Sequence, residues 1–178
     1  FQKQAFDVLA RGVASAFDLS REDPKLLERY DTGEFEPTDG AKKRNEYAKQ
    51  FSPVALGRQL LLARRLCEAG CGFVTVVDCT WDFHNDGNNP ATVEGMNVLG
   101  PQADHAIAAF MDDLEERGLT DKVLLLVTGE MGRSPKKQGN GGTGHWGRLT
   151  PLLVAGGGLK MGQVIGKTDR NGGEATTR

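Results

Sequence analysis

Apolar residues recur every three or four positions in several stretches of the chain, which is the spacing of an amphipathic helix. These stretches cover residues 2–18, 24–30, 53–69 and 101–118. Pro24 stands at a first helical position, and Ser52 is suited to cap a helix that begins at Pro53. Gly70 follows the last apolar position of the third stretch and predicts the end of that helix. We therefore expect four helices.

Short, almost continuous apolar runs alternate with the later helices. They span residues 72–78, 122–128 and 150–155, and residues 163–165 favour a short additional strand. Runs of this kind are typical of strands that are covered on both faces. A strand, a helix and a strand in succession form a right-handed parallel crossover in nearly all cases. The sequence thus predicts an α/β fold with a parallel or mostly parallel sheet and helices on both faces.

The chain divides into two predicted parts. Residues 1–51 read as an N-terminal helical segment and linker, because residues 31–43 are rich in glycine, proline, threonine and charge. Residues 52–178 hold the predicted strands and the two clearest helices, and we expect them to form the α/β domain.

Polar, reactive side chains follow the predicted strands. Asp82 and His84 come after the first strand, Glu130 and Arg133 after the second, and His145 lies in the glycine-rich stretch before the third. Ligands bind outside the carboxyl ends of the strands in open α/β sheets. The residues with the most chemistry therefore fall where this architecture places its sites.

Asp82 and His84, with Asp86 close behind, could chelate a divalent cation such as zinc, or form a polar loop that caps the next helix. Glu130 could meet a ligand at the strand tip, and Arg133 could hold an anion with its planar donors. The alternative for this pair is an ion pair that braces a turn. Taken alone, a loop histidine such as His145 is more often a surface residue than a ligand.

Composition narrows the classes of function. The chain has 178 residues, of which 38% are hydrophobic and 26% charged, with a formal net charge of −2. This suits one globular core, and no basic stripe indicates nucleic acid. No apolar run approaches the roughly 20 residues that span a bilayer. Three cysteines argue against a disulfide framework. Cys67 and Cys71 share a helix face, as two small buried side chains or as a redox or metal pair.

Other features carry less chemistry. The glycine-rich stretches do not match a phosphate-binding loop or a dinucleotide fingerprint, so a dehydrogenase is disfavoured. His105 lies inside a predicted helix and is not expected in the site. The acidic run at residues 112–117 reads as a solvated helix face.

Five ordered motifs together carry a family resemblance: the helix Leu56–Gly70 before a strand, Trp81–His84, Gly129–Pro135, Gly144–Trp146, and Ala155–Lys160 followed by Gly162–Gly166. This set resembles a large bacterial family known only as a domain of unknown function, which is related to sulfatases and alkaline phosphatases. The resemblance covers about residues 52–178.

The resemblance implies an incomplete alkaline phosphatase-like fold. It also implies a divalent metal centre, with zinc expected and manganese or calcium as alternatives. Asp82 and His84 match the first ligand loop, Glu130 matches the acid after the next strand, and His145 matches the later histidine. Arg133 would hold the substrate, a small anionic sulfate or phosphate ester. Relatives of this kind are often exported, which makes a periplasmic or exported location an expectation.

The pattern also departs from the superfamily. Met131 stands after Glu130, where active members carry a ligand-type residue, and no strand with an acid and a nucleophile precedes residue 52. We therefore expect the nucleophile to lie outside this sequence, and the chain alone not to turn over substrate by that mechanism. The alternative is a non-catalytic binding or structural module that keeps the fold without the chemistry.

Overall fold

A computed structural model describes residues 13–36, 55–79 and 81–176. Its helical elements are α2 (Val13–Ala16), η1 (Leu19–Arg21), α3 (Pro24–Arg29), η2 (Gly33–Phe35), α5 (Leu56–Glu68) and α6 (Thr92–Glu116). Its strands are β1 (Leu124–Thr128), β2 (Gly132–Arg133), β3 (His145–Trp146) and β4 (Leu152–Gly156). The predicted helical positions before residue 13 and the predicted start at Ser52 and Pro53 lie outside the described residues.

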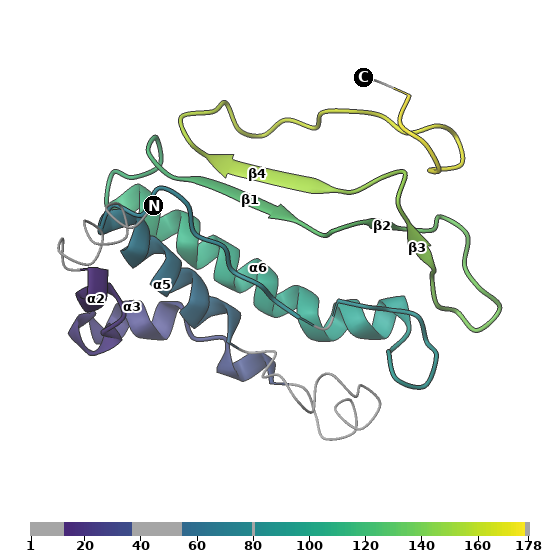
Figure 1. Ribbon diagram of the computed structural model, residues 1–178. Helices are drawn as coiled ribbons and strands as arrows, with labels where there is room; N and C mark the ends of the chain where they lie inside the picture. The colour runs from purple at the N-terminus through teal and green to yellow at the C-terminus, as the bar shows by residue number, and fades with distance from the viewer. Residues whose placement is uncertain (1–12, 37–54, 80, 177–178) are drawn as a thin grey trace, which may run out of the picture.

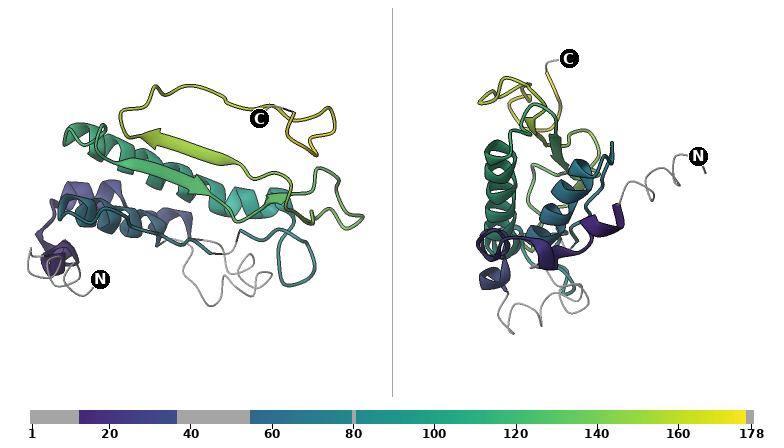
Figure 2. Two further views of the ribbon diagram at one scale, coloured as in Figure 1. Left: turned by 45° about the horizontal axis from the view of Figure 1, so that its top comes forward. Right: turned by 90° about the vertical axis from the view of Figure 1, so that its left-hand side faces the viewer.

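The core lies between helices α3, α5 and α6, and Figures 1 and 2 show the two long helices side by side. It consists of buried residues from both predicted parts of the chain: Leu26, Tyr30, Leu56, Leu60, Leu61, Ala106, Ala109, Phe110 and Leu114. The apolar faces of these helices thus form the core, as the spacing of apolar residues predicts. In the part of the chain that the structure describes, no helix has the length and apolar character needed to cross a bilayer.

The start of α3 and the end of α5 lie where the sequence predicts them. The side chain of Asp23 accepts a hydrogen bond from Lys25 N at 2.9 Å, and Pro24 begins α3. Gly70 adopts a φ of 94° after α5, and Cys71 N donates to Leu66 O at 2.9 Å. A left-handed residue at this position satisfies carbonyl groups that the helix end would otherwise leave unpaired.

The acidic run at residues 112–117 is not a wholly solvated face. Asp113 is 1% exposed and accepts hydrogen bonds from Arg64 Nε at 2.8 Å, Arg117 Nε at 2.7 Å and Tyr30 Oη at 3.0 Å. Glu22 also lies 3.1 Å from Arg64 Nη2. These groups form the buried ion cluster, which joins α5 and α6 to the N-terminal elements. The prediction failed because burial of one acid depends on a partner on another helix.

The predicted parallel sheet with helices on both faces is wrong. The described strands form two antiparallel pairs, β1 with β4 and β2 with β3. In the first pair Leu124 faces Gly156 and Thr128 faces Leu152. The β2–β3 pair continues the two arms of the first pair, so the strands resemble one long irregular hairpin (Figure 1). The alkaline phosphatase-like sheet expected from the resemblance is therefore not seen in the described residues.

The cause lies in the chain from residue 72 to residue 79. Its side chains alternate between half-buried and exposed, as in a strand, but it pairs with no strand in the described part of the chain. The crossover that would make the sheet parallel is therefore not formed. The chain between β1 and β4 contains no helix and reverses direction at the glycine-rich loop. β4 therefore runs antiparallel to β1.

Candidate metal centre

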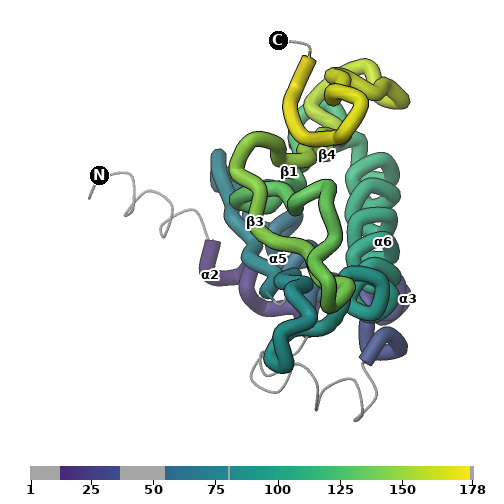
Figure 3. Tube along the Cα trace, turned by 90° about the vertical axis from the view of Figure 1, so that its right-hand side faces the viewer, coloured from purple at the N-terminus to yellow at the C-terminus, as the bar shows by residue number. Residues whose placement is uncertain are grey.

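Three of the predicted ligands meet at one end of the molecule, which faces the viewer in Figure 3. His84 Nε2 lies 2.9 Å from His145 Nε2 and 3.0 Å from Asp82 Oδ1. The remaining side of the triangle, from His145 Nε2 to Asp82 Oδ1, measures 3.3 Å. These three side chains form the triad, the only such group of histidine, cysteine and acid side chains that the described residues contain.

The dimensions of the triad suit a small transition-metal ion. A circle through the three atoms has a radius of about 1.8 Å, which is shorter than a zinc–ligand bond of about 2.0–2.1 Å. An ion placed on one side of the triangle can therefore contact all three atoms. His84 and Asp82 are partly exposed and His145 is about half exposed, so solvent and solutes can reach this position.

Asp82 and His84 are oriented by the residue between them. Phe83 is 4% exposed, and a β-carbon on Gly95 of α6 would lie 2.2 Å from its Cε1 atom. In extended chain, neighbouring side chains point to opposite sides, so burial of Phe83 directs Asp82 and His84 toward the site. Thr143 N also donates to Phe83 O at 3.2 Å.

Replacing Gly95 by alanine should lower the free energy of unfolding by about 1–3 kcal/mol, because the buried ring of Phe83 must shift. Chemical denaturation would measure this change. Gly100 on the same helix is the control, since its β-carbon would meet only Met96 Cε at 3.7 Å. Gly100→Ala should change stability by less than about 1 kcal/mol. Equal effects of the two substitutions would contradict the packing argument.

His145 is held by strand pairing and by the loop before it. It faces Arg133 in the β2–β3 pair, and its neighbour Trp146 donates from Nε1 to Gly173 O at 2.7 Å. Asn140 Nδ2 donates to His84 O at 3.1 Å and to Asn85 O at 2.8 Å. These bonds fasten the loop that leads to His145 onto the loop that holds His84.

Arg133 lies within the ligand set rather than beside it. Its Nη2 atom bonds to Asp82 Oδ1, and its Nη1 atom lies 3.3 Å from His84 Nε2. Nη1 also donates to Thr143 O at 3.2 Å, and Nη2 donates to Trp81 O at 3.4 Å. A guanidinium carries only donors, so each of these contacts uses an acceptor atom of the site.

The electrostatics of the site favour a charged Asp82. Burial by itself would raise the pKa of this carboxyl, but the hydrogen bonds from Arg133 and His145 outweigh burial and hold the pKa below its usual range. The nearby Asp86 is different, because its Oδ1 accepts from Asn89 N at 2.9 Å and Asn88 N at 3.1 Å. These backbone bonds lower the pKa of Asp86 and make it a brace of the loop.

A family model described as "Protein of unknown function (DUF1501)" matches residues 1–178. The chain belongs to the DUF1501 family. Comparisons with curated proteins and with solved structures give no match. Membership of a family of unknown function is therefore established, and none of the comparisons links the chain to sulfatases or alkaline phosphatases.

Other predicted residues of this DUF1501 chain lie apart from the triad. Glu130 follows β1, is exposed and does not belong to the ligand group. His105 lies on α6, where its Nε2 atom is 2.9 Å from Arg29 O, in line with its expected place outside the site. The three cysteines are free, in agreement with the expected lack of a disulfide framework.

Asn85 and Asn140 were not predicted as parts of the site. Asn85 has a positive φ of 52°, and its side chain bonds to Asn140 O. Asn140 could have been noticed from the sequence, because it stands between glycines and asparagine side chains often bond to nearby backbone groups. Nothing in the sequence shows that Asn140 contacts the loop that carries His84 and Asn85.

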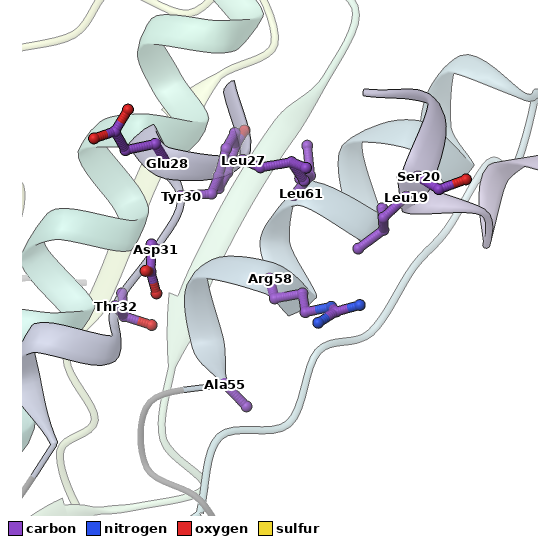
Figure 4. A pocket seen from close by; sticks show the side chains of 10 residues that line it. All are labelled: Leu19, Ser20, Leu27, Glu28, Tyr30, Asp31, Thr32, Ala55, Arg58 and Leu61. Carbon is purple, nitrogen blue, oxygen red and sulfur yellow. The ribbon is translucent and has the colours of Figure 1, made fainter. Parts of the chain in front are cut away.

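The DUF1501 chain also has a cavity of about 640 Å³ that involves none of the triad residues (Figure 4). Side chains from η1, α3 and α5 line it, and Arg58 and Asp31 are among the charged ones. Its lining shows no convergent group of metal ligands, whereas the triad does. The triad is therefore the candidate metal site, because donor chemistry, and not volume, determines where a metal can bind.

Proposed function

We propose that this chain supplies the metal ligands and the anion-binding arginine of a metal-dependent hydrolase of sulfate or phosphate esters. The observation that carries the proposal is the triangle of Asp82, His84 and His145, with the guanidinium of Arg133 in contact with two of its three ligand atoms. Glu130 stays a proposed ligand of a second metal, as the motif order suggests.

The donor set favours zinc. Two imidazole nitrogens and one carboxylate are common zinc ligands, whereas calcium prefers six to eight oxygen atoms. Three protein ligands leave a fourth position of a tetrahedral zinc ion open, as in catalytic zinc sites. A bound ion there would lower the pKa of a water molecule or neutralise charge on a transferring group. Arg133 would steady the anionic oxygens of the ester.

A second candidate function is a non-catalytic binding module, and the nearby hydroxyls favour it. Ser134 Oγ bonds within its own turn, to Lys136 O at 3.2 Å. Thr143 is buried, and its Oγ1 atom lies 3.4 Å from Thr92 Oγ1. Among the described residues, no base is seen beside either hydroxyl to activate it as a nucleophile. A module of this kind would bind the metal and the anion without cleaving an ester.

Metal content tests the shared first step. The wild-type chain should retain about one zinc ion per chain, measured by inductively coupled plasma mass spectrometry after removal of loose metal. His84→Ala and His145→Ala should each lose it, because two remaining ligands do not hold the ion. His105→Ala is the control and should keep the zinc, because His105 lies on α6 and is not part of the triad. A wild type that binds no zinc, even from excess, would refute the metal centre.

Ester cleavage then separates the two functions. The complete natural protein, loaded with zinc, would be assayed with p-nitrophenyl phosphate and p-nitrophenyl sulfate, beside its His84→Ala variant. Cleavage that the substitution abolishes supports the hydrolase. Stable zinc binding with no cleavage of either ester supports the binding module.

A further inference from the structure

The guanidinium of Arg133 and a bound metal ion would compete for the Nε2 atom of His84. Arg133 Nη1 lies 3.3 Å from it, and the proposed metal centre would use the same atom as a ligand. A neutral imidazole nitrogen has one lone pair, and a guanidinium can only donate. The same lone pair cannot accept from Arg133 and bind a metal ion. Metal binding therefore requires Arg133 to leave His84.

Arg133 has anchors that keep it near the site after this bond is lost. The carbonyl oxygens of Thr143, at 3.2 Å, and Trp81, at 3.4 Å, both accept from it. The guanidinium would then face a metal ion across a short distance. Two positive groups repel one another unless an anion lies between them.

We propose that metal and Arg133 exclude one another at His84 Nε2, and that the metal-loaded site binds a dianionic tetrahedral oxyanion between the ion and the guanidinium. This inference rests on the proposed function, because it needs the metal centre. It adds that anion binding depends on metal binding, and that the anion in turn strengthens metal binding, since such coupling is reciprocal.

The charge of the site selects the class of anion. A zinc ion contributes two positive charges and Arg133 one, while Asp82 contributes one negative charge. The loaded site is thus left with two positive charges when both histidines are neutral. A phosphate monoester carries close to two negative charges above neutral pH, and a sulfate monoester carries one. The charge of the loaded site therefore favours phosphate monoesters over sulfate monoesters.

Isothermal titration calorimetry with zinc tests the exclusion. Without an added anion, Arg133→Gln should bind zinc at least about fivefold more tightly than the wild type, because a competitor for His84 is gone. Arg148→Gln is the matched control, since Arg148 lies against Trp146 and pairs with Glu174 at the surface. It should bind zinc as the wild type does. Circular dichroism would confirm that each variant is folded.

A second titration needs no variant and uses two probes that have no ester bond to cleave. At mildly alkaline pH, phenylphosphonate should bind to zinc-loaded wild type and not to the metal-free protein, and benzenesulfonate should bind at least about tenfold more weakly. Saturating phenylphosphonate should also raise the zinc affinity of the wild type, and it should leave the zinc affinity of Arg133→Gln unchanged.

The outcomes separate the two proposals. A wild type that fails to bind zinc refutes the metal centre and with it this inference. Zinc binding that is unaffected by Arg133→Gln and by phenylphosphonate leaves the metal centre standing and refutes the exclusion. Equal binding of the two probes refutes the selection of dianions.

Discussion

Replacement of Arg64 by methionine is expected to lower the free energy of unfolding by about 3–5 kcal/mol. Arg64 is 1% exposed and contacts Asp113 and Glu22 of the buried ion cluster and the partly exposed Glu68 at its edge. Methionine matches the length of the side chain but leaves these carboxylates without the central cation. Arg117 still pairs with Asp113 and Glu68, and Arg65 still pairs with Glu22, so the cost is the loss of one buried cation from a cluster of carboxylates that then repel one another. Urea denaturation followed by circular dichroism would measure it.

Arg58→Met is the matched control, because Arg58 lies on the same helix and is exposed. Its substitution should change the free energy of unfolding by about 0.5 kcal/mol or less. A double variant, Arg64→Met with Asp113→Leu, should be less destabilised than the sum of the two single variants, since both charges are removed together. If Arg64→Met were no more destabilising than Arg58→Met, the cluster would not support the fold.

Features that depend on neighbouring residues in the sequence could be predicted. The start of α3 at Pro24 and the end of α5 at Gly70 depend on contacts within a few residues, and both predictions were confirmed. The start of α6 was not predicted correctly, because Pro101 was taken as a first helical position and lies inside the helix. Proline suits the first turn of a helix best, but packing of the residues before Pro101 extends α6 in the N-terminal direction, so that it begins at Thr92.

The sheet could not be predicted, because strand pairing depends on which segment lies beside each strand. The apolar runs suggested strands covered on both faces, yet Leu126 is 54% and Leu152 59% exposed. Val123 and Leu125 pack toward the core from the other face. The composition of a run shows that a strand is apolar, and it does not show how many of its faces are covered.

Three of the four predicted ligand residues lie close together although the predicted sheet was wrong. Asp82, His84 and His145 meet because the β2–β3 pair and the two interlocked loops bring them together, and not because parallel strands end at one edge. The contact of Arg133 with the ligand atoms had no sequence signal. It depends on a pairing between β2 and β3 that only the folded chain defines.

Replacing Gly142 by alanine is expected to weaken zinc binding by about 10–100-fold. A β-carbon on Gly142 would lie 1.9 Å from His84 O and 2.4 Å from His84 C, so alanine cannot be accommodated unless the backbone of a ligand residue moves. The two loops that carry His84 and His145 would separate, and the triangle of ligand atoms would widen. Titration of zinc against a chromophoric chelator would measure the affinity.

Gly139→Ala is the control, because its β-carbon would meet nothing within 4 Å although it lies in the same loop. This variant should bind zinc within about twofold of the wild type, since affinity follows the positions of the ligands and not the flexibility of the loop. If Gly142→Ala bound zinc as tightly as Gly139→Ala, the close packing of the two loops would not set the ligand geometry. A loss shared equally by both variants would instead indicate that the loop must remain flexible to admit the ion.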